Sequence, residues 1–596
     1  MVTSPRGQGF LCAAAKIAPR FTPRPFCATT GPITAREEES MSQPRTTAPA
    51  VTCFGPDFPF AYDDWLSHPA GLGALPEAAH GAEVAIIGAG IAGIVAAYEL
   101  MKLGLRPVLY EQGRLGGRLR SERFAGAEDV IAELGGMRFP TSSRGFYHYL
   151  DLVGLDTAPF PNPLSPASPS TVIDLEGTTT YIEGTGPLPP FFAEVQSAWA
   201  EALEQQSGFA ALQAALRARD VAALKSLWNP IVAAWDERTF YDFVASSPAF
   251  ARLSFHHREV FGQVGFGTGG WDSDFPNSML EILRVVLTEL EDDQRLVIGG
   301  VEQLPRRLWA HAPSRLVHWP AGTTLSALHN GAPRPGVARL ARAPDGAIAV
   351  TDRWGHERRY AAVLSTCQTW LLTTAIETDE RLFSQKLWMA LDRTRYMQSS
   401  KTFVMVDRPF WRDRDPVTNR YRMSCTLSDR LTRGTYLFDN GPDRPAVICL
   451  SYSWMSDALK VLPLPPERRV ALMLRALSAI YPDVDLPARI IGDPVTISWE
   501  ADPGFLGAFK GALPGHYRYN RRMYCHFMQD DLPPEQRGLF LAGDEISFTP
   551  AWAEGAVQTA LNAVGGIVRH LGGAAPAANP GPAESFAALA PVELPE

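Results

Sequence analysis

A short glycine-rich turn between two apolar segments constrains the fold of this chain more than any other feature. Residues 83–87 read Glu-Val-Ala-Ile-Ile, which is typical of a buried strand, and residues 94–100 have helical spacing. Gly88, Gly90 and Gly93 lie in the turn between them. Gly88 permits the tight turn, Gly90 lets the backbone approach a pyrophosphate, and Gly93 lets helix and strand pack closely. This order of strand, turn and helix predicts a Rossmann-like unit that holds a dinucleotide at the helix N-terminus.

The segment after this helix favours FAD over the other dinucleotides. A second predicted strand, residues 107–110, ends at Glu111, whose carboxylate can accept hydrogen bonds from both ribose hydroxyls and argues against a 2′-phosphate. Residues 115–120, Leu-Gly-Gly-Arg-Leu-Arg, bring a flexible backbone and two guanidinium groups to the phosphates. The glycine turn alone is shared by NAD, NADP and FAD, so the choice of FAD depends on this segment. A solvated surface role is the plainer alternative for Arg118.

Two further elements point to the same cofactor. Residues 131–140 again place paired glycines before an arginine, Arg138, which fits backbone lying against an isoalloxazine edge. Far along the chain, residues 538–544 form a predicted strand that ends at Asp544, which can bind the ribityl chain, and a predicted helix starts within residues 551–560. The chain must therefore leave the cofactor domain and return to it. The residues that we expect to bind FAD are Gly88, Gly90, Ala92, Gly93, Glu111, Gly117, Arg118, Gly136, Met137, Arg138, Leu325, Gly543, Asp544, Trp552, Ala556 and Val557.

With these motifs the chain resembles the flavin amine oxidases, whose fold pairs an FAD domain with an inserted substrate domain. The likeness runs from about residue 52 to 575. Within the family it is nearest to bacterial L-amino acid oxidase/monooxygenases acting on L-lysine and, more distantly, to tryptophan 2-monooxygenases. The segments that carry the likeness are residues 54–60, 133–140, 261–282, 399–403, 507–510 and 543–560.

The expected fold class is α/β, with a Rossmann-like FAD-binding domain and an interleaved α+β substrate-binding domain. We expect helices at residues 187–227 and strands between residues 402 and 500. Residues 1–50 are basic and rich in Pro, Ser, Thr and Ala, which predicts a disordered leader, either outside the native protein or an import signal. We expect residues after Gly572 to form a loose tail. The expected parts are residues 52–145, 295–400 and 525–575 for FAD, 146–294 and 401–524 for substrate, and 576–596 for the tail.

The resemblance implies roles for several side chains. Arg138 matches the arginine that holds the substrate carboxylate, a task for which its bidentate fork is suited. Lys401 matches a lysine that holds a water near flavin N5, where its charge would help the reduced flavin meet oxygen. The alternative for Arg138 is a contact with the FAD phosphates or a structural ion pair. The alternative for Lys401 is an ordinary lysine on an edge strand. The aromatic residues implied to line the substrate cavity, each of which could instead be ordinary core, are Tyr452, Trp454, Phe509 and Trp552.

A glycine-rich segment with two carboxylates is the candidate for recognising the far end of the substrate. Residues 267–275 contain Asp272 and Asp274, and the lysine enzymes that the chain resembles have the same sequence in this segment. A buried carboxylate there could pair with the ε-ammonium of lysine, and Asp274 is our choice for this contact. One of the two aspartates is expected to cap the helix predicted over residues 276–290.

The expected reaction starts from a neutral α-amine whose carboxylate lies on Arg138. The amino acid loses hydride to flavin N5 and becomes an imino acid. Its release gives a 2-oxo acid, ammonia and H2O2, whereas its retention during the reaction with O2 allows oxidative decarboxylation to an amide, CO2 and water. L-Lysine is the first candidate substrate, and tryptophan or phenylalanine is the alternative. Less favoured readings are a polyene desaturase, a peptide-lysine oxidase and a non-redox scaffold with bound FAD.

Composition excludes other partners. The net charge of −9 is spread along the chain without a basic stripe, so we expect no nucleic acid partner. The seven cysteines show no metal-ligand spacing, so we expect no metal and a reducing, cytoplasmic setting. The apolar runs are too short to cross a bilayer, so we expect no membrane. The remaining expected partners are a free L-amino acid, O2 and a second copy of the chain in a homodimer.

Overall fold

A computed structural model describes residues 55–263, 276–290 and 292–595. Its centre is a five-stranded sheet in which every neighbouring pair of strands is parallel. β1 is buried after its first residue, as expected for a parallel sheet covered on both faces. In sheet order the strands are β10 (Arg334–Pro335), β2 (Arg106–Glu111), β1 (Glu83–Ile87), β14 (Ala362–Ser365) and β23 (Leu539–Leu541).

The glycine turn after β1 has the geometry that its sequence predicts. Gly88 has φ +101°, in the region that favours glycine, and α2 (Ile91–Lys102) starts three residues later. A Cβ on Gly93 would lie 2.0 Å from the carbonyl oxygen of Gly88, so only glycine allows this approach of helix to strand. A Cβ on Gly90 would meet no atom of the described residues within 4 Å. The backbone is therefore open at Gly90 and tightly packed at Gly93.

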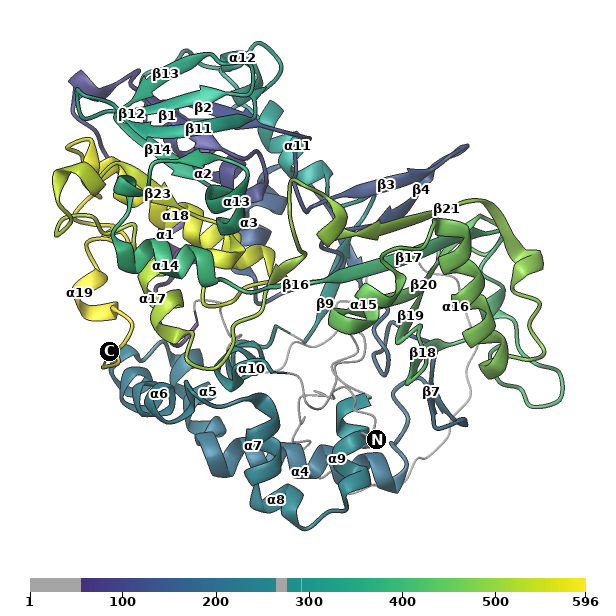
Figure 1. Cartoon of the computed structure of the whole chain (residues 1–596). Coiled ribbons are helices and arrows are strands. Elements are labelled where there is room, and N and C mark those ends of the chain that lie inside the picture. Colours follow the sequence, from purple (N-terminus) through teal and green to yellow (C-terminus); the bar gives the residue numbers. More distant parts are fainter. Residues whose placement is uncertain (1–54, 264–275, 291, 596) are drawn as a thin grey trace, which may run out of the picture.

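α18 (Ala553–His570) packs against α2 and brings the end of the chain to the start of the fold. A second, four-stranded sheet lies on the same side of the molecule in Figure 1. The buried side chains Ile87, Val350 and Leu539 belong to the core that joins the two sheets. The strands of the second sheet, in sheet order, are β13 (Glu357–Tyr360), β12 (Ile348–Asp352), β11 (Val337–Arg342) and β15 (Glu377–Thr378).

A seven-stranded sheet forms the other half of the molecule (Figure 1). β17 lies inside this sheet, antiparallel to a neighbour on each side, and Lys401 is paired with Tyr452 and Ile497. In sheet order the strands are β21 (Ile490–Ser498), β17 (Ser399–Val406), β20 (Ala446–Trp454), β19 (Gly434–Phe438), β18 (Cys425–Ser428), β7 (Ser170–Leu175) and β8 (Thr178–Glu183).

A layer of helices lies at the bottom of the view in Figure 1. It confirms the helices predicted over residues 187–227. The helices of this layer are α4 (Pro190–Ser207), α5 (Phe209–Ala218), α6 (Val221–Trp235), α7 (Phe240–Ser246), α8 (Pro248–Ala251), α9 (Phe255–Gln263) and α10 (Met279–Leu287). In the described residues, no helix is both long enough and apolar enough to span a membrane.

The remaining elements connect these layers. The other helices are α1 (Tyr62–Ser67), α3 (Arg144–Leu152), α11 (Gln303–Ala310), α12 (Leu325–Leu328), α13 (Thr369–Thr374), α14 (Gln385–Arg393), α15 (Met455–Val461), α16 (Pro466–Ile480), α17 (Tyr517–Cys525) and α19 (Phe586–Leu589). The short sheets are β3 (Ser121–Phe124) with β4 (Ala127–Glu133), β16 (Tyr396–Met397) with β22 (Phe509–Lys510), and β5 (Phe139–Pro140), β9 (Gln294–Val297) and β6 (Thr157–Pro159).

The expectation of a loose tail after Gly572 is wrong for the residues described. The Asn579 side chain donates hydrogen bonds to two backbone carbonyls near α1, and Leu589 is buried. The Lys225 ammonium donates to the carbonyls of Leu589 and Ala590. Composition suggested disorder because few large apolar side chains are present, whereas backbone carbonyls and a few side chains supply the contacts that hold this segment.

Candidate active site

A cavity of about 590 Å³ is lined by residues from both halves of the fold. The parallel sheet contributes the turn after β1 and the segment after β23, and the seven-stranded sheet contributes residues of β17 and β20. The site residues predicted from the sequence that line it are Gly88, Gly90, Ala92, Glu111, Gly117, Arg118, Gly136, Met137, Arg138, Lys401, Tyr452, Trp454, Phe509, Gly543, Asp544, Trp552 and Ala556.

Three of the predicted residues lie elsewhere. Gly93 and Val557 are buried in the packing around α2 and α18, next to the wall rather than on it. Leu325 in α12 is fully buried in the hydrophobic core and does not line the cavity. Asp274 lies outside the described residues, as does Asp272. The expectation that one of these aspartates caps the next helix is wrong, because Ser278 is the N-cap of α10 and its hydroxyl accepts a hydrogen bond from the Leu280 amide.

At the end of the cavity formed by the glycine turn, the Glu111 carboxylate links the turn after β1 to the segment after β2. Its oxygens accept hydrogen bonds from the amides of Ala89 and Gly113, each at 2.7 Å. Burial raises the pKa of Glu111, and these amides oppose the rise. The open backbone at Gly90 lies beside Gly117, whose Cβ, if present, would be 3.2 Å from the Gly90 Cα. This end of the cavity thus combines a carboxylate with exposed glycine backbone, as a ribose and a pyrophosphate require.

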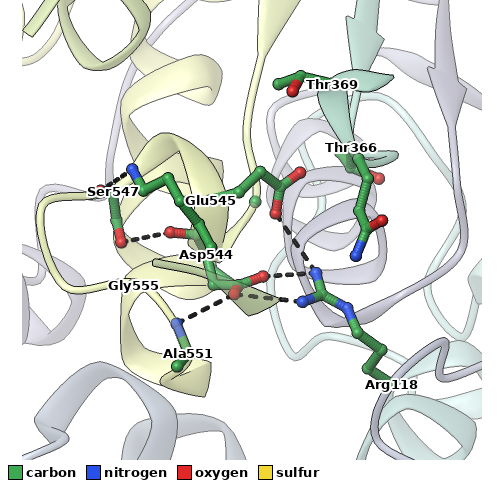
Figure 2. A network of polar contacts seen from close by, with 12 residues as sticks. Arg118, Thr366, Thr369, Asp544, Glu545, Ser547, Ala551 and Gly555 are labelled. Carbon is green, nitrogen blue, oxygen red and sulfur yellow. Dashed lines mark hydrogen bonds and ion pairs between the residues drawn. The ribbon is translucent and has the colours of Figure 1, made fainter. Parts of the chain in front are cut away.

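Arg118 is held by two carboxylates that follow β23 (Figure 2). Its guanidinium is 2.5 Å from Asp544 Oδ1 and 3.3 Å from Glu545 Oε2, and it also donates to the carbonyl of Ala508. Asp544 accepts a further hydrogen bond from the Ala551 amide. Burial opposes ionisation of Asp544, but the Arg118 charge and the hydrogen bonds that Asp544 makes together outweigh burial and lower the Asp544 pKa. The sequence predicted Arg118 and Asp544 separately and missed both their pairing and Glu545.

Buried polar atoms near the cavity and the open backbone at Gly90 indicate whether this cavity suits FAD. Burial and the charge of Asp544 raise the pKa of Glu545 to about 8. Within the described residues, Glu545 Oε1 and Gln368 Oε1 are buried and accept no hydrogen bond. Gln368 lines the cavity, whereas Glu545 is not among its lining residues. The Gln368 acceptor suits a ribityl hydroxyl, and the opening at Gly90 suits the pyrophosphate, so the residues present fit the cofactor.

Arg138 lies in an aromatic surround on the other side of the cavity. Its side chain is mostly buried and donates to Asn162 Oδ1 at 3.3 Å. The guanidinium carbon is 5.4 Å from the ring centre of Phe160, 5.6 Å from that of Tyr436 and 5.7 Å from that of Tyr452. Because these rings exclude water, a carboxylate that reaches the guanidinium pairs with it in a medium of low dielectric.

Lys401 is a buried amine in the interior of a sheet. Its Nζ donates to the carbonyls of Gly135 at 2.5 Å and Glu133 at 3.1 Å, and lies 4.7 Å from the ring centre of Tyr452. Burial lowers its pKa to about 7. Strands flank β17 on both sides, so the alternative of an ordinary edge-strand lysine does not apply. A lysine with this pKa can change its charge near neutral pH.

The predicted aromatic residues meet edge to face. The Tyr452 and Trp454 rings are 5.2 Å apart, and the Trp454 and Phe509 rings are 5.7 Å apart, both pairs nearly perpendicular. Trp552 is the N-cap of α18 and follows Ala551, which has φ +71°. All four rings line the cavity and form an apolar wall from residues of β20, β22 and the start of α18.

The sequence does not predict a part of the cavity wall that carries two polar side chains. Asn277, Glu281 and Val285 line it from α10 and the residues just before that helix. Glu281 Oε2 accepts hydrogen bonds from the Ala512 amide at 2.8 Å and from Asn277 Nδ2 at 3.3 Å. Burial raises the pKa of Glu281, while the nearby Lys510 amine opposes the rise. Asn277, Glu281 and Val285 are spaced by four residues, which indicates one helical face. The helix is otherwise mostly apolar, so its sequence did not mark this face as part of a site.

Comparisons with known proteins identify the family and the fold of the chain. The family model for flavin containing amine oxidoreductase matches residues 91–568. A tryptophan 2-monooxygenase of Pantoea agglomerans pv. gypsophilae is 32% identical over 539 residues, which cover 84% of this chain and 91% of that protein. A flavin-dependent L-tryptophan oxidase of Lentzea aerocolonigenes is 26% identical over 514 residues, 81% of this chain and 98% of its own length. The structure of cyclohexylamine oxidase from Brevibacterium oxydans covers 83% of this chain and 100% of its own with a TM-score of 0.60 at 16% identity, a likeness in fold alone. The predicted fold class is confirmed.

Proposed function

Because the chain belongs to the flavin-containing amine oxidoreductase family and uses FAD, we propose that it oxidises the Cα–N bond of a free L-amino acid. When bound, FAD supplies the two-electron acceptor for this step. The observation that carries the proposal is the mostly buried guanidinium of Arg138 in the same cavity as Lys401 and the aromatic wall. A simple amine has no group for that guanidinium, whereas an amino acid carboxylate matches its fork.

The side chains of the cavity then have distinct tasks. Arg138 binds the carboxylate and thereby fixes the position of Cα. Tyr452, Trp454 and Trp552 exclude water from the reacting end of the substrate. Lys401 supplies a titratable amine at the place where O2 is to be reduced, and its proton and positive charge are available near pH 7.

We propose an aromatic L-amino acid as the preferred substrate, with tryptophan as the first candidate. The named relatives act on tryptophan, which supports this alternative over L-lysine. An aromatic wall formed by Trp454, Phe509 and Trp552 suits a planar side chain, since perpendicular and offset ring pairs are favourable. In the proposed reaction one amino acid and one O2 give one amide, one CO2 and one water. The competing oxidase reaction consumes O2 and water and gives the 2-oxo acid, ammonia and H2O2.

The test is anaerobic bleaching of the yellow protein by single compounds, followed by product analysis in air. We expect L-tryptophan to bleach the flavin at lower concentration than L-phenylalanine or L-lysine, and tryptamine, which lacks the carboxylate, to need far more. Amide as the main product supports the monooxygenase reaction, and 2-oxo acid with H2O2 supports the oxidase reaction. Bleaching by tryptamine as readily as by tryptophan would contradict an amino acid substrate, and bleaching by none of them would contradict the whole proposal.

A further inference from the structure

One face of α10 brings a single carboxyl group to the cavity wall. Glu281, Ile282 and Val285 lie on the side of α10 that lines the cavity, and Asn277 precedes them by one turn. Phe509 and Lys510 line the same cavity, and the Ala512 amide that follows them donates a hydrogen bond to Glu281. Glu281 is the only acidic residue of α10, and the residue as a whole is 7% exposed. A carboxyl placed here costs stability unless it is hydrogen-bonded.

Only half of the Glu281 carboxyl is satisfied by the described residues. Oε2 accepts the hydrogen bonds from Ala512 and Asn277, whereas Oε1 is buried and has no hydrogen-bond partner in the part of the chain that the structure describes. Buried polar atoms without a partner are uncommon in native proteins and call for an explanation. At a cavity wall, the straightforward explanation is a partner carried by the ligand.

The nearby cations are engaged elsewhere. The Lys510 amine donates to the Ser547 carbonyl at 2.9 Å and to Asn520 Oδ1 at 3.2 Å rather than to Glu281. Arg284, one turn further along α10, forms a two-point ion pair with Asp57, with contacts of 2.6 and 2.9 Å. The positive charges around Glu281 therefore stabilise a negative carboxylate at a distance without occupying Oε1.

We propose that Glu281 Oε1 accepts a hydrogen bond from an N–H group at the far end of the substrate side chain, and so selects amino acids that carry one. This inference rests on the proposed function, because it concerns the side chain of the same amino acid whose carboxylate Arg138 binds. An indole N–H and an ε-ammonium share this chemistry, while phenylalanine and norleucine lack it. A site built to bind a substrate N–H discriminates strongly against the analogue without it, because its own acceptor is then left unpaired.

The test compares two pairs of amino acids in Glu281→Gln. The Ala512 amide and Asn277 Nδ2 hold an acceptor at the Oε2 position, so the glutamine carbonyl takes that position and its NH2 replaces Oε1. A donor then faces the donor of the substrate. We expect the preference for tryptophan over phenylalanine, or for lysine over norleucine, to fall about 10- to 150-fold in anaerobic flavin reduction, as removal of a charged hydrogen bond predicts. The apolar member of the pair should be bound as well as before.

The pair that loses its preference identifies the donor, tryptophan indicating an indole and lysine an ammonium. Glu289→Gln is the matched control, since Glu289 follows the same helix, pairs with Arg217 and does not line the cavity. Glu281→Asp, which keeps the charge and withdraws the oxygen from the cavity, provides a second variant if the first does not retain FAD. Unchanged preferences in the variant that retains FAD, or equal losses for all four amino acids, would overturn the inference. Failure of the wild-type protein to be bleached by any amino acid would instead overturn the proposed function.

Discussion

Replacing Arg138 with methionine should raise the half-saturating concentration of the amino acid about 100- to 20,000-fold. The guanidinium is mostly buried and has three ring centres within 5.7 Å, so a bound carboxylate is desolvated and has little alternative solvation. Each charged hydrogen bond contributes about 1.5–3 kcal/mol, and the two bonds of the fork together contribute roughly 3–6 kcal/mol. At about 1.4 kcal/mol for each factor of ten, this gives the stated range. Methionine preserves much of the packed volume.

The assay is an anaerobic titration of flavin absorbance with L-tryptophan and, separately, with tryptamine. Tryptamine keeps the amine and the indole but lacks the carboxylate, so its half-saturating concentration should be the same in wild type and Arg138→Met. Arg138→Lys keeps the charge and loses the fork, and should lie between them. FAD content, read from the visible spectrum, controls for folding. An unchanged value for tryptophan, or equal shifts for tryptophan and tryptamine, would refute the assignment of Arg138 to the carboxylate.

Three further predictions concern other parts of the molecule. The Lys401 pKa of about 7 means that its ammonium form is present below pH 7 and lost above it. Reoxidation of the reduced flavin by O2, measured by stopped flow, should therefore slow as pH rises through about 7, and in Lys401→Met it should be slow at every pH. A flat pH profile in the wild-type protein would contradict this. Gly135→Ala places a Cβ 1.6 Å from the Arg118 carbonyl oxygen and should abolish FAD binding, whereas Gly565→Ala in α18, with no described atom within 4 Å of its Cβ, should stay yellow with an equal or higher Tm. Deleting residues 580–596 should lower the Tm measured by calorimetry, because buried contacts are lost, and an unchanged Tm would show that this segment contributes no stability.

The sequence could predict features in which a steric or chemical need is local. Gly88 and Gly93 are required by a backbone angle and by a close approach within a few residues, so the turn and its neighbouring strand and helix were readable. Most of the predicted site residues line one cavity because the motifs adjoin strand ends and helix starts, where a parallel sheet presents its ligand site. The roles assigned to those side chains stay predictions.

The missed features depend on contacts between distant segments. Glu281 lies in a helix that reads as apolar, and only the approach of Ala512 and the cavity shows that its carboxyl is half satisfied. The pairing of Arg118 with Glu545 joins residues far apart in the sequence. Leu325 was placed at the cofactor although it packs in the core, since a lone leucine carries no signal that separates these positions. Charge partners and burial of this kind become visible only in three dimensions.

The position of β23 at the edge of the parallel sheet has a consequence for synthesis of the protein. β23 pairs with β14, yet it is translated long after β1 and β2 have left the ribosome. At roughly 5–20 residues per second, translation of the segment between β14 and β23 takes about 10–35 seconds, during which β14 is an open, apolar edge. Premature termination before residue 539 would make that exposure permanent. We therefore expect such fragments to aggregate, and the full chain to depend on chaperones more than its finished structure suggests.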